Sequence, residues 1–141
     1  MTAATSLPES ATPLAGARIV LGVSGGIAAY KSVEVCRRLV DAGAHVTPVM
    51  TEGATHFLGP TTLTADAIPH TRLGQTADLV VVAPCTARVV SAYAHGLSTD
   101  LLTNILIATR APVVVAPAMH TEMWEHPAVA ANIELLAVRG V

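Results

Sequence analysis

The chain has 141 residues, of which 52% are hydrophobic and 3% aromatic, and its formal net charge is −2. This length suits one domain with a substantial core, which Val, Ala, Leu and Ile must build. The small negative charge argues against nucleic acid as a partner, because nucleic-acid binding needs a clustered basic face. No apolar run is long enough to predict a membrane span.

Residues 1–17 are small and polar, and we interpret them as a flexible N-terminal tail before one domain at 18–141. The tail lacks the basic and apolar regions of an export signal. Cys36 and Cys85 fall in different elements and form no Cys-x-x-Cys pair. Free thiols without an export signal predict a cytoplasmic protein.

The apolar patterning alternates between strands and helices. Strands are predicted at 18–23, about 44–50, 79–83 and 113–116, and the Val-rich third strand should be buried on both faces. Helices are predicted at about 27–42, 86–95, 99–109 and 128–138, whereas residues 59–76 show little regular pattern. The alternation predicts an α/β fold, with a doubly wound parallel sheet and helices on both faces.

Three turns follow the carboxyl ends of predicted strands, at residues 24–26, 84–87 and 117–120, and Thr51 ends the second strand. Ligands of doubly wound sheets bind at this edge. Gly25 in the first turn lets a phosphate approach the backbone, and the next helix offers free N–H groups. The alternative interpretation is that Gly25 and Gly26 only form a tight turn, which a glycine pair indicates equally well.

The type of nucleotide can be narrowed from the first turn. A dinucleotide fingerprint is excluded, because Ser24 and Ile27 stand where it needs glycines and no acidic residue follows the second strand. A P-loop is excluded, because Tyr30 stands where it needs glycine. What remains is a mononucleotide at a hydroxyl-rich edge, for which FMN in a flavodoxin-like sheet is the standing example.

Three segments, Gly22–Lys31, His70–Asp78 and Pro117–Trp124, occur in this order. Together they resemble the phosphopantothenoylcysteine decarboxylase family, especially the decarboxylase domain of bifunctional bacterial coenzyme A biosynthesis proteins, over residues 18–141. The resemblance implies a flavodoxin-like (Rossmann-type) fold, FMN as cofactor, and homotrimers that build sites at subunit interfaces and can assemble into a dodecamer. It implies decarboxylation of 4′-phosphopantothenoylcysteine to 4′-phosphopantetheine, in which the flavin oxidises the cysteine to a thioaldehyde.

The resemblance also implies roles for individual residues. His70 matches the catalytic histidine, which manages a proton near the substrate; a surface histidine in a loop is the alternative. His120, where many relatives have asparagine, would hold the substrate carboxylate beside Met123, although Met123 and Trp124 could also be core residues. Contacts to FMN are implied for Ser24, Gly25, Gly26, Ile27, Thr51, Ala83, Pro84, Cys85, Thr86 and Ala118.

Some residues depart from a simple reading of the family pattern. Arg88 stands where the family often has asparagine, so an amide contact to the flavin is not expected. Cys85 is interpreted as a packing thiol rather than a nucleophile, because no histidine follows in a base position. The histidines show no metal-ligand spacing, and no metal is predicted. The resemblance places a clamp with a proton-donating cysteine beyond Val141.

Three other functions use the same sheet. A peptidyl-cysteine decarboxylase of peptide-antibiotic maturation would share the fold, flavin and histidine and would stop at the ene-thiol. A flavin prenyltransferase is disfavoured by the Met123-Trp124 pair. A non-catalytic flavin-binding regulatory subunit would need long charged extensions, which we do not find in the sequence.

Overall fold

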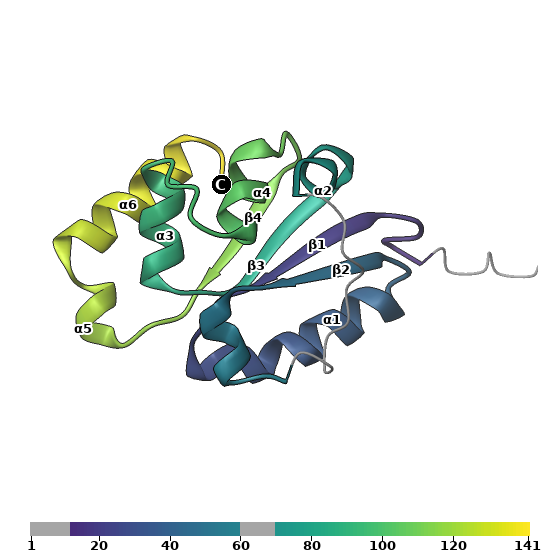
Figure 1. Ribbon diagram of the computed structural model, residues 1–141, viewed down its shortest axis with the longest axis horizontal. Coiled ribbons are helices and arrows are strands. Elements are labelled where there is room, and N and C mark those ends of the chain that lie inside the picture. The colour runs from purple at the N-terminus through teal and green to yellow at the C-terminus, as the bar shows by residue number, and fades with distance from the viewer. Residues whose placement is uncertain (1–11, 60–69) are drawn as a thin grey trace, which may run out of the picture.

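The structure is a computed structural model, which describes residues 12–59 and 70–141, with only the backbone of His70. Four parallel strands form one sheet with helices on both faces (Figure 1). The strands are β1 (Arg18–Val23), β2 (His45–Met50), β3 (Leu79–Cys85) and β4 (Val113–Pro117). Their order, β2-β1-β3-β4, is that of a flavodoxin-like sheet. The predicted α/β fold is confirmed.

The register brings the carboxyl ends of the strands to one edge. β1 pairs with β2, with Val23 opposite Met50, and with β3, with Gly22 opposite Val82. β3 pairs with β4, and their register shifts between Val82 and Cys85. Because all four strands are parallel, the loops that follow them start side by side.

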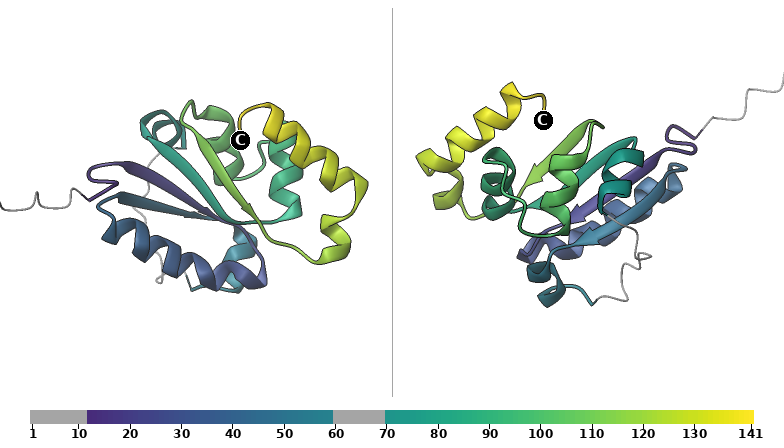
Figure 2. Two further views of the ribbon diagram at one scale, coloured as in Figure 1. Left: turned by 180° about the vertical axis from the view of Figure 1, so that it is seen from behind. Right: turned by 45° about the horizontal axis from the view of Figure 1, so that its top comes forward.

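The helices divide between the two faces of the sheet. Helix α1 (Lys31–Asp41) covers one face, and α2 (His70–Thr76), α3 (Ala87–Ala94) and α4 (Leu101–Ala108) cover the other (Figure 2). Helix α6 (Pro127–Val138) packs against α3, and the short α5 (Thr121–Trp124) precedes it. Two 3₁₀ helices, η1 (Ile27–Tyr30) and η2 (Glu52–His56), follow β1 and β2.

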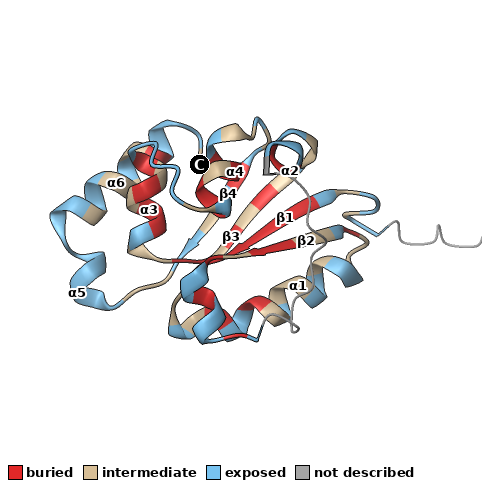
Figure 3. Cartoon of the chain, viewed as in Figure 1, coloured by how far each residue is buried: buried red, intermediate tan, exposed pale blue. Residues whose placement is uncertain are grey.

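Each face of the sheet has its own apolar core. Leu21 and Val23 point toward α1, whereas Val80 and Val82 pack against α3 and α4. Buried residues therefore follow the central strands, as Figure 3 shows. The core consists of Val, Ala, Leu and Ile with Cys85, as the composition predicts. In the edge strand β4, Val114 is 51% exposed.

Three helices differ from the prediction, of which the four-residue α5 was not predicted. The predicted helix at 27–42 begins as η1 and becomes α-helical only at Lys31, because helix starts often adopt the tighter 3₁₀ turn. Helix α2 falls in the stretch without a regular pattern. Leu73 is its one large buried apolar side chain among the described residues, and a single such residue cannot produce a helical repeat of apolar positions in the sequence. A Cβ at Gly74 would lie 3.2 Å from the Ala108 Cβ, so glycine lets α2 pack closely on α4.

Part of the predicted tail lies within the described residues. The backbone N–H groups of Leu14 and Gly16 donate to the carbonyls of Ala42 and Gly43, at 2.9 and 3.0 Å. Residues 1–11 lie outside the described residues, so the boundary at residue 18 stays a prediction. No described helix has the length and apolar character needed to cross a membrane.

Candidate functional site

The loops that follow β1, β3 and β4 are joined at the carboxyl edge of the sheet. Ser24, directly after β1, donates its hydroxyl to the Pro84 carbonyl at 2.7 Å and accepts from the Thr86 N–H at 3.0 Å. The Ala118 N–H, directly after β4, donates to the Cys85 carbonyl at 3.0 Å. The structure therefore brings together residues from all three predicted loops.

The Ser24 side chain is fully buried, and its hydroxyl both donates and accepts within the protein. A serine hydroxyl has only one proton to donate. We therefore expect Ser24 to shape the site by holding the loop after β1 against the loop after β3. A direct contact between its side chain and a cofactor stays a prediction.

Gly25 meets Gly53, which follows β2, at very short range. A Cβ on Gly25 would lie 2.5 Å from the Gly53 carbonyl carbon and 2.7 Å from its oxygen. Only glycine lets the two backbones approach so closely. Gly53 was not predicted from the sequence, although a glycine two residues beyond Thr51, at the carboxyl edge of the predicted sheet, is a signal that could have identified it.

Thr51 places a buried hydroxyl at the same edge. The residue is 3% exposed, and its Oγ1 has no hydrogen-bond partner among the described residues. A buried hydroxyl without a partner costs about 1–3 kcal/mol. Together with the close-packed glycines, it fits a site in which a polar group of a ligand completes the hydrogen bonding.

The loop after β3 offers backbone groups rather than reactive side chains. Cys85 is 1% exposed, and burial raises the pKa of its thiol to about 12. It therefore stays protonated near neutral pH and packs in the core, as predicted. Arg88 forms an ion pair with Asp100 at 2.9 Å, so its side chain is engaged on α4. In the first loop, Ile27 is 82% exposed and leaves an apolar side chain free for contact.

The predicted substrate-binding residues lie on and before α5, beyond the end of β4 (Figure 1). His120 is the exposed N-cap residue of this helix. Met123 and Trp124 are 45% and 48% exposed. The alternative that these two side chains are core residues is therefore wrong. They are large apolar groups available to a ligand or a partner.

His70 begins α2, on the face of the sheet opposite α1. Its helix packs against α4, and Leu73 lies beside Val20 in the amino-terminal half of β1. The structure therefore does not place α2 in the cluster of loops at the carboxyl edge. Among the described residues, no group of three or more His, Cys, Asp or Glu side chains is arranged to hold a metal ion.

Comparison with known proteins places this geometry in a family. The family described as Flavoprotein matches residues 8–141. The Coenzyme A biosynthesis bifunctional protein CoaBC of Mycobacterium tuberculosis is 47% identical over 137 residues, which cover 87% of this chain and 33% of that protein. The protein of the same name from Escherichia coli is 46% identical over 144 residues, covering 91% and 36%. The chain thus spans about a third of the length of these relatives.

Comparison with solved structures finds proteins of the same kind. A PPC decarboxylase mutant complexed with pantothenoylaminoethenethiol is 31% identical, with a TM-score of 0.81 over 89% of this chain and 79% of that chain. The FMN-dependent cysteine decarboxylase SpaF is 30% identical, with a TM-score of 0.81 over 90% and 82%. The peptidyl-cysteine decarboxylase EpiD, at 17% identity and a TM-score of 0.82, supports the fold alone. The chain belongs to the Flavoprotein family, and its predicted kinship with the phosphopantothenoylcysteine decarboxylases is confirmed.

Proposed function

We propose that this chain is the decarboxylase part of a coenzyme A biosynthesis protein. It would convert 4′-phosphopantothenoylcysteine to 4′-phosphopantetheine and carbon dioxide with FMN as cofactor. The proposal is carried by the buried Thr51 hydroxyl, which has no hydrogen-bond partner within residues 12–59 and 70–141, beside the tightly packed Gly25 in a chain of this family. The relatives named for coenzyme A biosynthesis support the choice of substrate.

The carboxyl edge supplies what FMN needs. Thr51, Thr86 and the backbone at Gly25 and Gly26 would hold the phosphate, because glycine exposes N–H groups there. The flavin ring would lie against apolar and backbone surface of the remaining predicted contact residues, which are Ile27, Ala83, Pro84, Cys85 and Ala118. Ser24 would contribute by holding these loops in place.

Two histidines would manage charge and protons around the substrate. When bound, FMN supplies the oxidation of the substrate cysteine that makes loss of carbon dioxide easy. His120, exposed at the start of α5, would hold the substrate carboxylate through a charge-assisted hydrogen bond. Met123 would contact the apolar part of the substrate, and His70 would take or hold the proton of the reacting thiol.

We infer that the sites are completed between subunits of a homotrimer, which could assemble further into a dodecamer. Helix α2 packs away from the cradle of its own chain, so His70 would serve the FMN site of a neighbour. Exposed apolar side chains near the carboxyl edge support self-association: Ile27 is 82% exposed, Tyr30 59% and Phe57 50%. A cytoplasmic location belongs to the same proposal, because both cysteines are free thiols.

A peptide substrate is the second candidate. TvaF, an FMN-dependent cysteine decarboxylase from thioviridamide biosynthesis, is 27% identical with a TM-score of 0.82, and SpaF is equally similar in structure. The exposed α5 would leave room for a larger substrate. In that case the carboxylate held by His120 would be the C-terminus of a peptide.

The deciding experiment measures both cofactor and product. Purified protein should be yellow and release FMN on denaturation, and it should release carbon dioxide from 4′-phosphopantothenoylcysteine faster than from a peptide ending in cysteine. Faster release from the peptide would select the second candidate. Bound FMN without carbon dioxide from either compound would indicate a regulatory flavoprotein, and colourless protein that FMN cannot reconstitute would exclude a flavin function.

The Thr51 hydroxyl provides a test of the cradle. Thr51→Val keeps the shape and removes the hydroxyl, so affinity for FMN should fall by about tenfold, the lower end of the range for one hydrogen bond to a charged group. The FMN-free variant should be no less stable than the parent, because the lost hydroxyl has no hydrogen-bond partner in the part of the chain that the structure describes. Flavin titration and thermal unfolding measure the two effects. Thr51→Ser, which retains a hydroxyl, should bind FMN nearly normally.

His120 should affect substrate binding rather than the cofactor. His120→Ala should raise KM by roughly 10- to 100-fold, since a charge-assisted hydrogen bond is worth about 1.5–3 kcal/mol. His120→Asn should recover much of this loss, because an amide can also donate to a carboxylate. Steady-state kinetics measure both, with His95→Ala, at an exposed position after α3, as the control. An unchanged KM in His120→Ala would contradict the assignment.

A further inference from the structure

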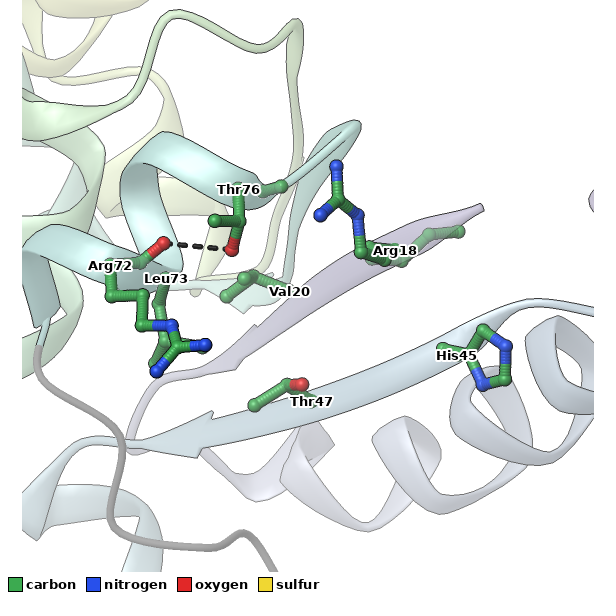
Figure 4. A pocket seen from close by; sticks show the side chains of 9 residues that line it. Arg18, Val20, His45, Thr47, Arg72, Leu73 and Thr76 are labelled. Carbon is green, nitrogen blue, oxygen red and sulfur yellow. Dashed lines mark hydrogen bonds between the residues drawn. The ribbon is translucent and has the colours of Figure 1, made fainter. Parts of the chain in front are cut away.

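A cavity of about 510 Å³ lies at the opposite half of the sheet from the loops described above. It is formed by the amino-terminal halves of β1 and β2 and by α2 (Figure 4). Its polar lining comprises Arg18, His45, Thr47, Arg72 and Thr76. None of the predicted FMN contacts lines it. Its volume falls in the range of small-molecule sites, about 300–1,000 Å³.

The polar lining of this cavity is cationic. Arg72 extends from α2 toward Thr47 of β2, and Arg18 lies at the other end beside Thr76 (Figure 4). Asp78 partly neutralises Arg18: it accepts from the Arg18 backbone N–H at 2.8 Å and from its Nε at 3.4 Å. Within the described part of the chain, the lining includes no carboxylate and Arg72 forms no ion pair.

Hydroxyl and apolar groups complete the surface. The Thr76 hydroxyl donates to the Arg72 carbonyl at 2.8 Å, within its own helix, whereas Thr47 on β2 faces the cavity (Figure 4). Val20 and Leu73 are buried and provide an apolar floor. The cavity therefore offers a cationic and hydroxyl-bearing rim beside an apolar surface.

We propose that this cavity binds a phosphorylated small molecule, separately from FMN. The phosphate is held by the Arg72 guanidinium and the Thr47 hydroxyl, because the planar fork of arginine donates two parallel hydrogen bonds to a phosphate. Arg18 adds a second guanidinium and His45 an imidazole at the rim. The organic part of the ligand lies against Val20 and Leu73. Only binding is claimed, so the inference does not depend on decarboxylase activity.

Isothermal titration with two probes, adenosine 5′-monophosphate and inorganic phosphate, tests the proposal. The protein is used loaded with FMN and freed of excess flavin, so that the carboxyl edge is occupied. One equivalent of the nucleotide per chain should bind, more tightly than phosphate if the apolar floor contributes. Equal affinities would show that phosphate alone is recognised, and would overturn the proposed contact of the organic part with Val20 and Leu73.

Arg72→Ala should weaken nucleotide binding by about tenfold or more. Arg37→Ala removes the same charge from exposed α1, on the other face of the sheet, and should leave binding unchanged. Thr47→Val, which should also weaken binding, is the second variant if Arg72→Ala does not fold. Absence of binding, or an equal loss in Arg37→Ala, would overturn the proposal.

Discussion

Replacing His70 with asparagine should leave the protein yellow and lower the rate of carbon dioxide release by about 10²–10⁴-fold, the usual effect of removing a general acid or base. Asparagine has similar size but cannot take up a proton near neutral pH. FMN should stay bound, because the flavin cradle is built from the loops after the strands and α2 packs elsewhere.

Carbon dioxide release and flavin absorbance, followed in the same sample, measure the two effects of His70→Asn. His95→Asn, at an exposed position after α3, is the control and should retain activity. If His70→Asn turned over at the parent rate, the assignment of the catalytic histidine would be wrong, while the fold and the flavin cradle would stand.

Gly25→Ala should produce the largest loss of cofactor. Its Cβ would lie 2.5 Å from a backbone atom of Gly53, so the two loops must separate. Overpacking of this kind costs about 1–3 kcal/mol, which corresponds to roughly 10- to 100-fold weaker FMN binding if the loops move apart at the cradle.

Gly26→Ala is the matched comparison for Gly25→Ala. Gly26 has an extended backbone, with φ −161° and ψ 161°, and its Cβ would meet only the Thr86 methyl, at 3.3 Å. A side-chain methyl can yield more easily than a neighbouring backbone, so Gly26→Ala should lose less FMN. Flavin titration of both variants checks this order, and the reverse order would argue that the Gly25–Gly53 approach does not shape the cradle.

His70→Asn and Gly25→Ala together test whether each site is built from two subunits. If His70 serves a neighbouring subunit, a mixture of His70→Asn and Gly25→Ala chains should regain activity, because some interfaces combine an intact His70 with an intact cradle. Mixed oligomers formed by co-expression provide the material. Sedimentation identifies the trimer, and a mixed trimer without activity would show that each chain must supply both parts.

The fold could be predicted from the sequence because strands and turns are indicated by residues that are close together in the chain. A Val-rich run such as 79–83 predicts a buried strand, and turns such as 24–26 and 84–87 mark the carboxyl ends where ligands bind. The structure has this strand at Leu79–Cys85 and places both turns at one edge of the sheet, since parallel pairing aligns the strand ends. The family could also be identified from the sequence, because three short segments resemble it and occur in the same order along the chain.

Contacts between distant residues were decided only by the tertiary structure. The sequence by itself indicated that Ser24 and Gly25 lie in a functional loop. It did not indicate that Ser24 bonds to the loop after β3, or that Gly25 touches Gly53. Helix α2 was invisible, because one buried apolar side chain makes no period and its stability comes from packing on α4. The burial of Thr51 without a hydrogen-bond partner among the described residues, and the proximity of Arg72 to Thr47, likewise depend on how separate elements pack. The residue pattern of one element does not indicate which other element it will contact.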